Sequence, residues 1–276
     1  MGYYINSDTK SEILYHGSKR GIEGAIIPKS ENATDFGNGF YMGTKEIQTL
    51  ARVSNEPNPK EYQFKISDKY INEQNTLCLS IDDWVYFVLY NRGKLEDLQE
   101  TCFYEKYSHL ADGKDFIIGP IADDVYDLCI THFSKGLITD WTFKQLIDCF
   151  DYGLQVVAKS QRACSVLEKT LEKSLSKEDR NEIKAKRIVT RKERVTYYEK
   201  KVAELNAERK GRFLNEIKAE IQTKEATQFA MKDSRRSNER VESIIDECSA
   251  QIEKFKNIKF PDKIHERKDV ECELFK

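Results

Sequence analysis

The sequence predicts an α+β domain followed by a long helical region, and three observations carry this prediction. Of the 13 glycines, 12 lie at or before Gly153, so turn-forming residues become rare beyond that point. Before it, short strand-like runs and helix-start signals are mixed without the regular strand–helix rhythm of a doubly wound parallel sheet. The formal charge is −8 over residues 1–160 and +6 over residues 161–276. We therefore expect a compact domain over residues 1–165 and a charged helical region over residues 166–276.

The strands of this domain are predicted from short apolar or alternating runs bounded by Gly, Pro and Asn. Alternation of this kind is typical of strands that bury one face of a sheet. Because the runs do not alternate regularly with helices, a mixed or antiparallel sheet is favoured. The six runs cover residues 13–15, 39–42, 62–66, 76–79, 116–118 and 154–158.

Four helices are predicted between the strands from polar residues that can accept hydrogen bonds from a first helical turn. Acidic residues at these starts also suit the positive end of the helix dipole. Thr44 is expected to cap a helix over residues 45–54, Asp82 and Asp83 to start one through residue 89, Asp123 and Asp124 to start one that stops at Gly136, and Asp140 to cap one through residue 150.

The region beyond Gly153 contains no Gly or Pro for 57 residues, and again none over residues 212–260. Such stretches favour long helices. Apolar residues recur there at helical spacing in two stripes, which predicts a helical hairpin or a small bundle packed on the first domain or on a partner. The stripes are Val195, Tyr198, Val202 and Leu205, and later Val241, Ile244, Cys248, Ile252 and Phe255.

Composition argues against several other classes of protein. The seven cysteines are odd in number and form no Cys-x-x-Cys pair, so neither a disulfide framework nor a metal site is expected. The longest strongly apolar run, residues 84–90, is far too short to span a membrane, and the first six residues do not resemble a signal peptide. A cytoplasmic location without a membrane partner is expected, although a substrate of a signal-less secretion system would have the same features.

Two short strings near the N-terminus are the most informative part of the chain. The first, Leu14-Tyr15-His16-Gly17-Ser18, is an apolar strand that ends in a histidine and a Gly-Ser turn. The second, Asp35-Phe36-Gly37-Asn38-Gly39-Phe40-Tyr41-Met42-Gly43-Thr44, is a Gly-x-Gly turn that leads into an aromatic strand. Together, in this order and at this separation, they suggest the two halves of a nicotinamide-dinucleotide pocket.

These strings resemble the ADP-ribosyltransferase superfamily, in the branch with a histidine, a tyrosine and a third polar residue that includes diphtheria toxin and the poly(ADP-ribose) polymerases. With Gly119-Pro120-Ile121-Ala122-Asp123-Asp124 they also look like a family of uncharacterised bacterial domains assigned to that superfamily. The resemblance covers roughly residues 12 to 165 and implies a split mixed or antiparallel sheet, with NAD as co-substrate. It implies that NAD is contacted by His16, Gly17, Ser18, Phe36, Gly37, Gly39, Phe40, Tyr41 and Thr44.

The residue types suit that chemistry. A histidine can hydrogen-bond a ribose hydroxyl, the backbone of Gly17 can pair with the nicotinamide amide, and the ring of Tyr41 offers a stacking face. Gly37 and Gly39 permit turn conformations and close approach. Each residue also has a structural interpretation, since a strand-end histidine is often only a hydrogen-bonding group and Tyr41 is one of 14 tyrosines.

The resemblance implies a third catalytic residue, Glu or sometimes Gln, on a late strand, and Gln155 is the candidate. An amide can orient the ribose, but it supplies no negative charge and cannot act as a general base. Transfer of a single ADP-ribose unit is therefore expected rather than polymer synthesis. Asp35, Asp123 or Asp124 are the candidates to deprotonate the acceptor, although the last two also make a simple helix start.

Residues 184–212 hold 11 basic residues against four acidic ones. Such a helix could contact a nucleic-acid backbone, but solvated helix faces are commonly rich in Lys and Glu, and a protein partner is about equally compatible with the pattern. The candidate nucleic-acid-binding residues are Lys184, Lys186, Arg187, Arg191, Lys192, Arg194, Lys200 and Lys201.

The combined expectation is a mono-ADP-ribosyltransferase that cleaves NAD and modifies a macromolecule, with nucleic acid slightly favoured over protein as the acceptor. The resemblance implies a bacterial toxin of a toxin–antitoxin or anti-phage system, with a cognate antitoxin or helical partner. Two alternatives stay open: an NAD glycohydrolase, and a non-catalytic binding module that keeps the NAD fold.

Overall fold

The computed structural model describes residues 13–30, 34–66, 70–121, 125–147, 149, 153–228, 239 and 242. The chain divides into two compact units, Met1–Gln222 and Thr223–Lys276. The first unit contains the sheet and every element discussed below. The second predicted stripe, from Val241 to Phe255, lies outside the described residues, as do Asp123 and Asp124.

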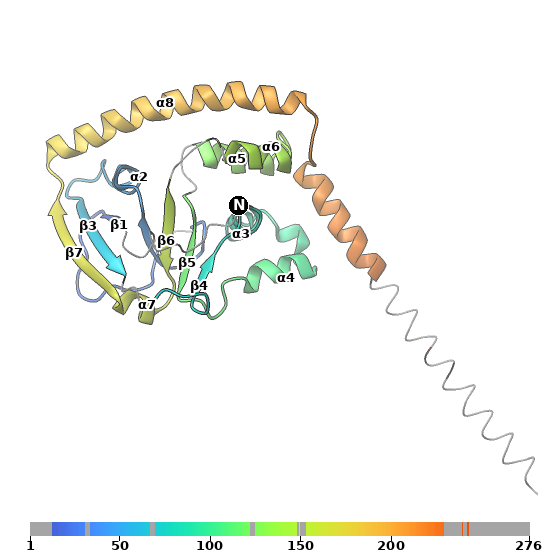
Figure 1. The fold of residues 1–276 in the computed structure, drawn as a ribbon, viewed down its shortest axis with the longest axis horizontal. Helices are drawn as coiled ribbons and strands as arrows, with labels where there is room; N and C mark the ends of the chain where they lie inside the picture. Colours follow the sequence, from blue (N-terminus) through green and yellow to red (C-terminus); the bar gives the residue numbers. More distant parts are fainter. Residues whose placement is uncertain are drawn as a thin grey trace, which may run out of the picture. The chain divides into compact units, whose positions relative to one another are not determined.

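The first unit is built on a seven-stranded mixed sheet, which confirms the α+β prediction (Figure 1). The strand order is β4-β5-β6-β2-β1-β3-β7, and only β4 and β5 run parallel. All six predicted strands are present, with ends that differ by at most three residues. The strands are β1 (Leu14–Ser18), β2 (Phe40–Gly43), β3 (Lys60–Ile66), β4 (Thr76–Cys78), β5 (Phe116–Pro120), β6 (Leu154–Ala158) and β7 (Leu167–Ser174).

The sheet is divided between β1 and β2. These two central strands share a single residue pair, Tyr15 with Gly43. In contrast, β1 pairs with β3 at all five of its residues, and β2 pairs with β6 at all four. The sheet therefore consists of two well-paired halves, β4-β5-β6-β2 and β1-β3-β7, that are joined at one point, as the resemblance implies.

The helices pack on the sheet and complete its core. α3 starts at Ser80, whose side chain accepts the Asp83 N–H, and α6 starts after Thr139, whose hydroxyl accepts the Thr142 N–H at 3.2 Å. The chain turns after α5 at Gly136, which has a φ of 68°. The helices are α2 (Glu46–Ala51), α3 (Ile81–Asn91), α4 (Cys102–His109), α5 (Val125–Ser134), α6 (Asp140–Ile147), α7 (Gln161–Ser165) and α8 (Lys177–Ala207), with a 3-10 turn at Glu96–Leu98.

Thr44 does not cap a helix, contrary to the prediction. The N-cap of α2 is Lys45, without a side-chain cap. Thr44 instead continues the pairing of β2 with β6: its N–H donates to the Leu154 carbonyl and its hydroxyl accepts the Leu154 N–H, both at 2.9 Å. The Thr44 hydroxyl is therefore used in strand pairing and does not accept a hydrogen bond from the first turn of α2.

The predicted helical region does not begin at residue 166, because β7 lies there. β7 pairs with β3 from Ile66 to Lys60. Its partly buried residues are Leu167 and Leu171, and the bulge between Lys169 and Leu171 places these two side chains on opposite faces, so β7 lacks the regular alternation of a half-buried strand. The long helix α8 begins only at Lys177, after a Ser176 capping box.

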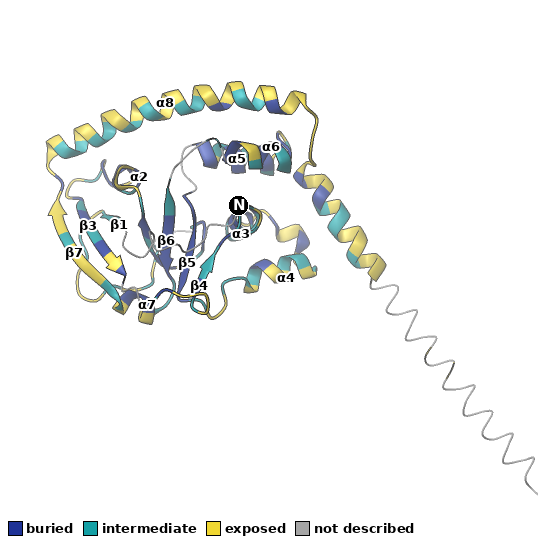
Figure 2. Ribbon diagram, viewed as in Figure 1, coloured by how far each residue is buried: buried dark blue, intermediate teal, exposed yellow. Residues whose placement is uncertain are grey.

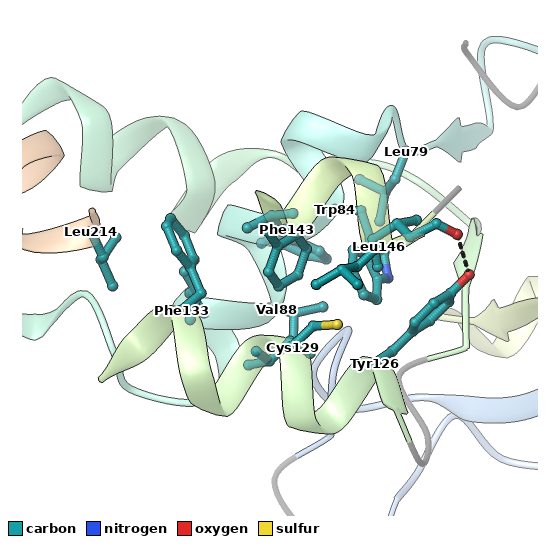
Figure 3. Close-up of a cluster of buried hydrophobic side chains, with 14 of the residues drawn as sticks. Leu79, Trp84, Val88, Tyr126, Cys129, Phe133, Phe143, Leu146 and Leu214 are labelled. Atoms are coloured by element: carbon teal, nitrogen blue, oxygen red, sulfur yellow. Dashed lines mark hydrogen bonds between the residues drawn. The ribbon is translucent and has the colours of Figure 1, made fainter. Parts of the chain in front are cut away.

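Two apolar clusters lie on the two faces of the sheet. The larger one joins Ile117 and Val157 to the inner faces of α3, α5 and α6, and Trp84 is among its completely buried members (Figure 3). The stripe predicted on α8 packs on this cluster through the buried Tyr198 and Leu205, which confirms the contact with the first domain (Figure 2). The opposite face buries a second cluster, which includes Leu14, Phe40, Met42, Tyr62, Phe64, Ile118 and Val156.

Candidate functional site

His16 bridges the division in the sheet. Its Nδ1 lies 2.7 Å from the carbonyl oxygen of Tyr41, and its ring stacks on Phe40 with centroids 4.3 Å apart. A carbonyl oxygen can only accept, so Nδ1 carries the hydrogen and the neutral ring keeps an acceptor lone pair on Nε2. His16 is thus fixed in the tautomer that can accept a hydrogen bond from a hydroxyl group.

Burial lowers the pKa of His16, and the hydrogen bond to the Tyr41 carbonyl only partly opposes this effect. The unfolded chain, with an ordinary histidine pKa of about 6.5, then binds the proton more readily than the native state does. The free energy of unfolding should therefore fall as the pH falls below about 6.5. Urea unfolding at pH 7.5 and 5.5 checks this: His16→Asn should lose less stability over this interval than the wild type, and an equal loss would contradict it.

Tyr41 holds the turn that precedes it. Its hydroxyl accepts the Phe36 N–H at 3.0 Å and lies 2.6 Å from the Gly37 carbonyl oxygen and 2.7 Å from the Thr34 hydroxyl. Burial is the main cause that raises the pKa of Tyr41 to about 12, so the phenol stays protonated. The hydroxyl is committed to the turn, and a ligand would meet the ring of Tyr41 rather than its oxygen.

The Gly-x-Gly turn is closed by Lys159, which sequence reasoning did not identify. Its Nζ donates to the carbonyls of Phe36 at 2.7 Å and Asn38 at 2.5 Å. A Cβ on Gly37 would lie 2.9 Å from Asn91 Oδ1 and 3.4 Å from Lys159 Nζ, and one on Gly39 would lie 2.5 Å from Val157 Cγ1. Both glycines therefore make room for side chains of the protein itself.

Asp35 is held in an ion pair. Both Nε and Nη2 of Arg92 lie within 2.9 Å of its Oδ1, and Arg92 Nη1 also contacts Asp127 at 2.6 Å. Asp35 is buried and the next residue, Phe36, is completely buried in the larger core cluster. This geometry favours a structural role for Asp35 over the predicted role of acceptor-activating base.

Gln155 lies on the strand next to Tyr41. The register pairs Tyr41 with Val157 and Gly43 with Gln155, so Tyr41 and Gln155 share one face of the sheet. Gln155 is 5% exposed, and its Nε2 donates to the Pro120 carbonyl at 3.0 Å. Among the described residues no group hydrogen-bonds to its Oε1, which leaves a buried acceptor available to a ligand.

His16 and Tyr41 therefore flank the division on opposite faces of the sheet, and Gln155 lies one strand further away, on β6. The His16 ring packs with Phe40 and Tyr62 on the face of the second cluster, whereas Tyr41 packs against the first. His16 and Tyr41 are connected through the hydrogen bond from His16 Nδ1 to the Tyr41 carbonyl. A ligand placed at the edge between β1 and β2 could reach both faces.

Gly17 has a strand partner only on the β3 side, Glu61, within the described part of the chain. Its backbone edge toward β2 is not covered by a strand. On the face of Tyr41, however, a Cβ on Gly17 would lie 2.8 Å from Val53 Cγ2 and 3.0 Å from the Thr49 carbonyl oxygen. Ser18 closes a local turn instead, with its hydroxyl 3.0 Å from both the N and the O of Gly21.

Several basic residues of α8 make ion pairs or hydrogen bonds within the protein. Lys186 pairs with Glu182 at 2.6 Å and Lys201 with Glu204 at 3.1 Å, while the Arg187 guanidinium donates to the Ala51 carbonyl at 3.4 Å. The remaining candidates, Lys184, Arg191, Lys192, Arg194 and Lys200, lie on the same helix, partly or fully exposed. Ion pairs between neighbouring helical residues are typical of a solvated face.

No metal site or membrane-spanning segment emerges from the described residues. No group of three or more His, Cys, Asp or Glu side chains could hold a metal ion there. None of the helices in this part of the chain combines the length and apolar character needed to cross a membrane.

Comparison with known proteins identifies a family. A family model described as "Protein of unknown function (DUF3990)" matches residues 12–169, more than half of the chain, from the residues before β1 to the first residues of β7. No curated protein and no solved structure matches the chain.

Proposed function

We propose a function on the premise that the chain belongs to the DUF3990 family, whose description assigns no activity. The protein cleaves NAD and transfers one ADP-ribose unit to a macromolecule. The bond between the nicotinamide nitrogen and ribose C1′ breaks with its electron pair going to nicotinamide, and a nucleophile of the acceptor bonds to C1′ and loses its proton. By the resemblance, such an enzyme would serve as a toxin in bacterial conflict or defence against phage.

The division of the sheet supports this proposal most directly. A continuous seven-stranded sheet would need more than one residue pair between its central strands β1 and β2. The edge of β1 from His16 to Ser18 faces β2 without a strand partner, and it offers backbone donors and acceptors of the kind that pair with a carboxamide. We expect the carboxamide of NAD to pair with this edge.

The side chains at the division support the same ligand. Nε2 of His16 accepts a hydrogen bond from a ribose hydroxyl, because Nδ1 is committed to Tyr41. The Tyr41 ring offers a stacking face, and Oε1 of Gln155 is the buried acceptor for a second hydroxyl. Gln155 orients the ribose without adding negative charge, which favours single transfer.

Incubation of the full chain with adenylate-labelled NAD and cell extract, followed by nuclease or protease digestion, tests the proposal. Label on a macromolecule together with free nicotinamide is expected. Release of the label by nuclease identifies a nucleic-acid acceptor, and release by protease identifies a protein acceptor. Free ADP-ribose alone would indicate NAD hydrolysis, and intact NAD would indicate a binding module.

A further inference from the structure

The helix α8 packs on both halves of the divided sheet. It follows β7 directly, so its start belongs to the β1-β3-β7 half (Figure 1). At its far end the Tyr198 hydroxyl lies 2.7 Å from His132 Nδ1 on α5, and Asn206 contacts Thr142 on α6 at 3.2 Å. These helices belong to the core on the other half. α8 therefore spans the division.

The first half of α8 is packed on α2 and the turn after it. Ile183 contacts a small buried cluster of Leu50, Val53 and Leu175. Two arginines add hydrogen bonds to backbone carbonyls on the same segment: Arg180 donates to Glu56 at 2.7 Å and Arg187 to Ala51 at 3.4 Å. Three side chains of α8 thus contact the segment from residue 46 to residue 56 and fix its position on the helix.

The segment held in this way is the one that covers Gly17. Val53 belongs to the cluster under Ile183, and its methyl group fills the space above Gly17 on the Tyr41 face. Thr49, on α2 just before the turn that carries Val53, closes the other side of the space with its carbonyl oxygen. A nicotinamide ring that paired with the Gly17 edge and stacked on Tyr41 would have to displace Val53.

We propose that α8 is an autoinhibitory strap that holds Val53 over Gly17 and so restricts access of the dinucleotide to the divided edge. This inference rests on the proposed function. Release of the first half of α8 from α2 opens the Gly17 edge, while the second half stays docked on α5 and α6. The strap restrains cleavage of NAD until that release occurs.

The test compares Ile183→Ala, which weakens the contact with α2, with Val202→Ala, which removes a similar apolar group from the docked end of the same helix. Two readouts on the full chain are used: amide hydrogen exchange over residues 46–53 and the rate of nicotinamide release from NAD. Ile183→Ala should speed both by about five- to tenfold. Val202→Ala should lower the melting temperature without speeding release.

Val53→Ala provides a second variant, which removes the side chain over Gly17 and leaves every residue of α8 unchanged. It should also speed nicotinamide release, and combining it with Ile183→Ala should add little, because both changes open the same contact. If the wild type releases nicotinamide and both Ile183→Ala and Val53→Ala release it at the same rate or more slowly, the strap is overturned while the proposed function stays intact. If neither the wild type nor any variant released nicotinamide, the proposed function would fail and the strap with it.

Discussion

Replacing His16 with alanine is expected to reduce kcat/KM for nicotinamide release by about 100-fold or more, in the range seen when one preorganised hydrogen-bonding group is lost from an active site. The imidazole is fixed by its bond to the Tyr41 carbonyl and by stacking on Phe40. Its removal also takes away the only side-chain bridge to Tyr41 across the division that the described residues provide. Both substrate contact and alignment of the two half-sheets are therefore lost.

Steady-state release of nicotinamide measures this effect. His109→Ala is the matched control, because His109 is exposed on α4 and pairs with Asp112 at 2.7 Å, far from the sheet division. The control should retain wild-type kcat/KM. A His16→Ala protein that folds and releases nicotinamide at the wild-type rate would remove His16 from the catalytic site.

Replacing Trp84 with alanine is expected to lower the free energy of unfolding by about 3–5 kcal/mol, the cost typical of deleting a large buried aromatic side chain. Trp84 is completely buried, with ring centroids 5.8 Å from Tyr126 and 6.1 Å from Phe143 (Figure 3). Its Nε1 donates to the Pro120 carbonyl at 2.9 Å. The substitution therefore leaves both a cavity and a carbonyl with one donor fewer.

Urea unfolding measures the change, and Trp84→Phe separates its two parts. Phenylalanine fills much of the volume but cannot donate, so it should cost distinctly less than alanine. The same Pro120 carbonyl also accepts the Gln155 Nε2, so loss of the indole can alter the orientation of Gln155. Equal costs for the two variants would show that packing in this cluster contributes little.

The sequence predicted β5 and β6 well because their apolar runs are buried on both sides. β5 and β6 have nine buried residues among their ten, and such runs have few alternatives. β7 was missed because it is an edge strand with only two partly buried leucines. Its charged residues carry no period that distinguishes a strand from a helix.

The candidate site was predicted in part. The two strings predicted the strands that carry His16 and Tyr41, whereas their position as neighbours at the division comes from the structure. The side chains that hydrogen-bond to the Gly-x-Gly turn and to Asp35 before it were not predicted. Lys159 and Arg92 reach that turn from positions more than fifty residues away, and a lone Lys after a strand or a lone Arg after a helix carries no signal of its partner.

The role of Thr44 shows why local signals can fail. A threonine before an apolar helix is a good cap in isolation. Here the same hydroxyl accepts a hydrogen bond from Leu154, which is 110 positions away in the chain. A pairing between strands distant in sequence thus overrides a local preference.

The two outer strands of the sheet also have a consequence for solubility. β4 is only three residues long, and β7 exposes Lys and Glu along its length, with Glu172 bound to Lys60 and Lys169 at 2.7 Å each. A short border and a charged border both disfavour strand addition by another molecule. The sheet can therefore be open at its centre, between β1 and β2, while its outer borders resist fibril-like association.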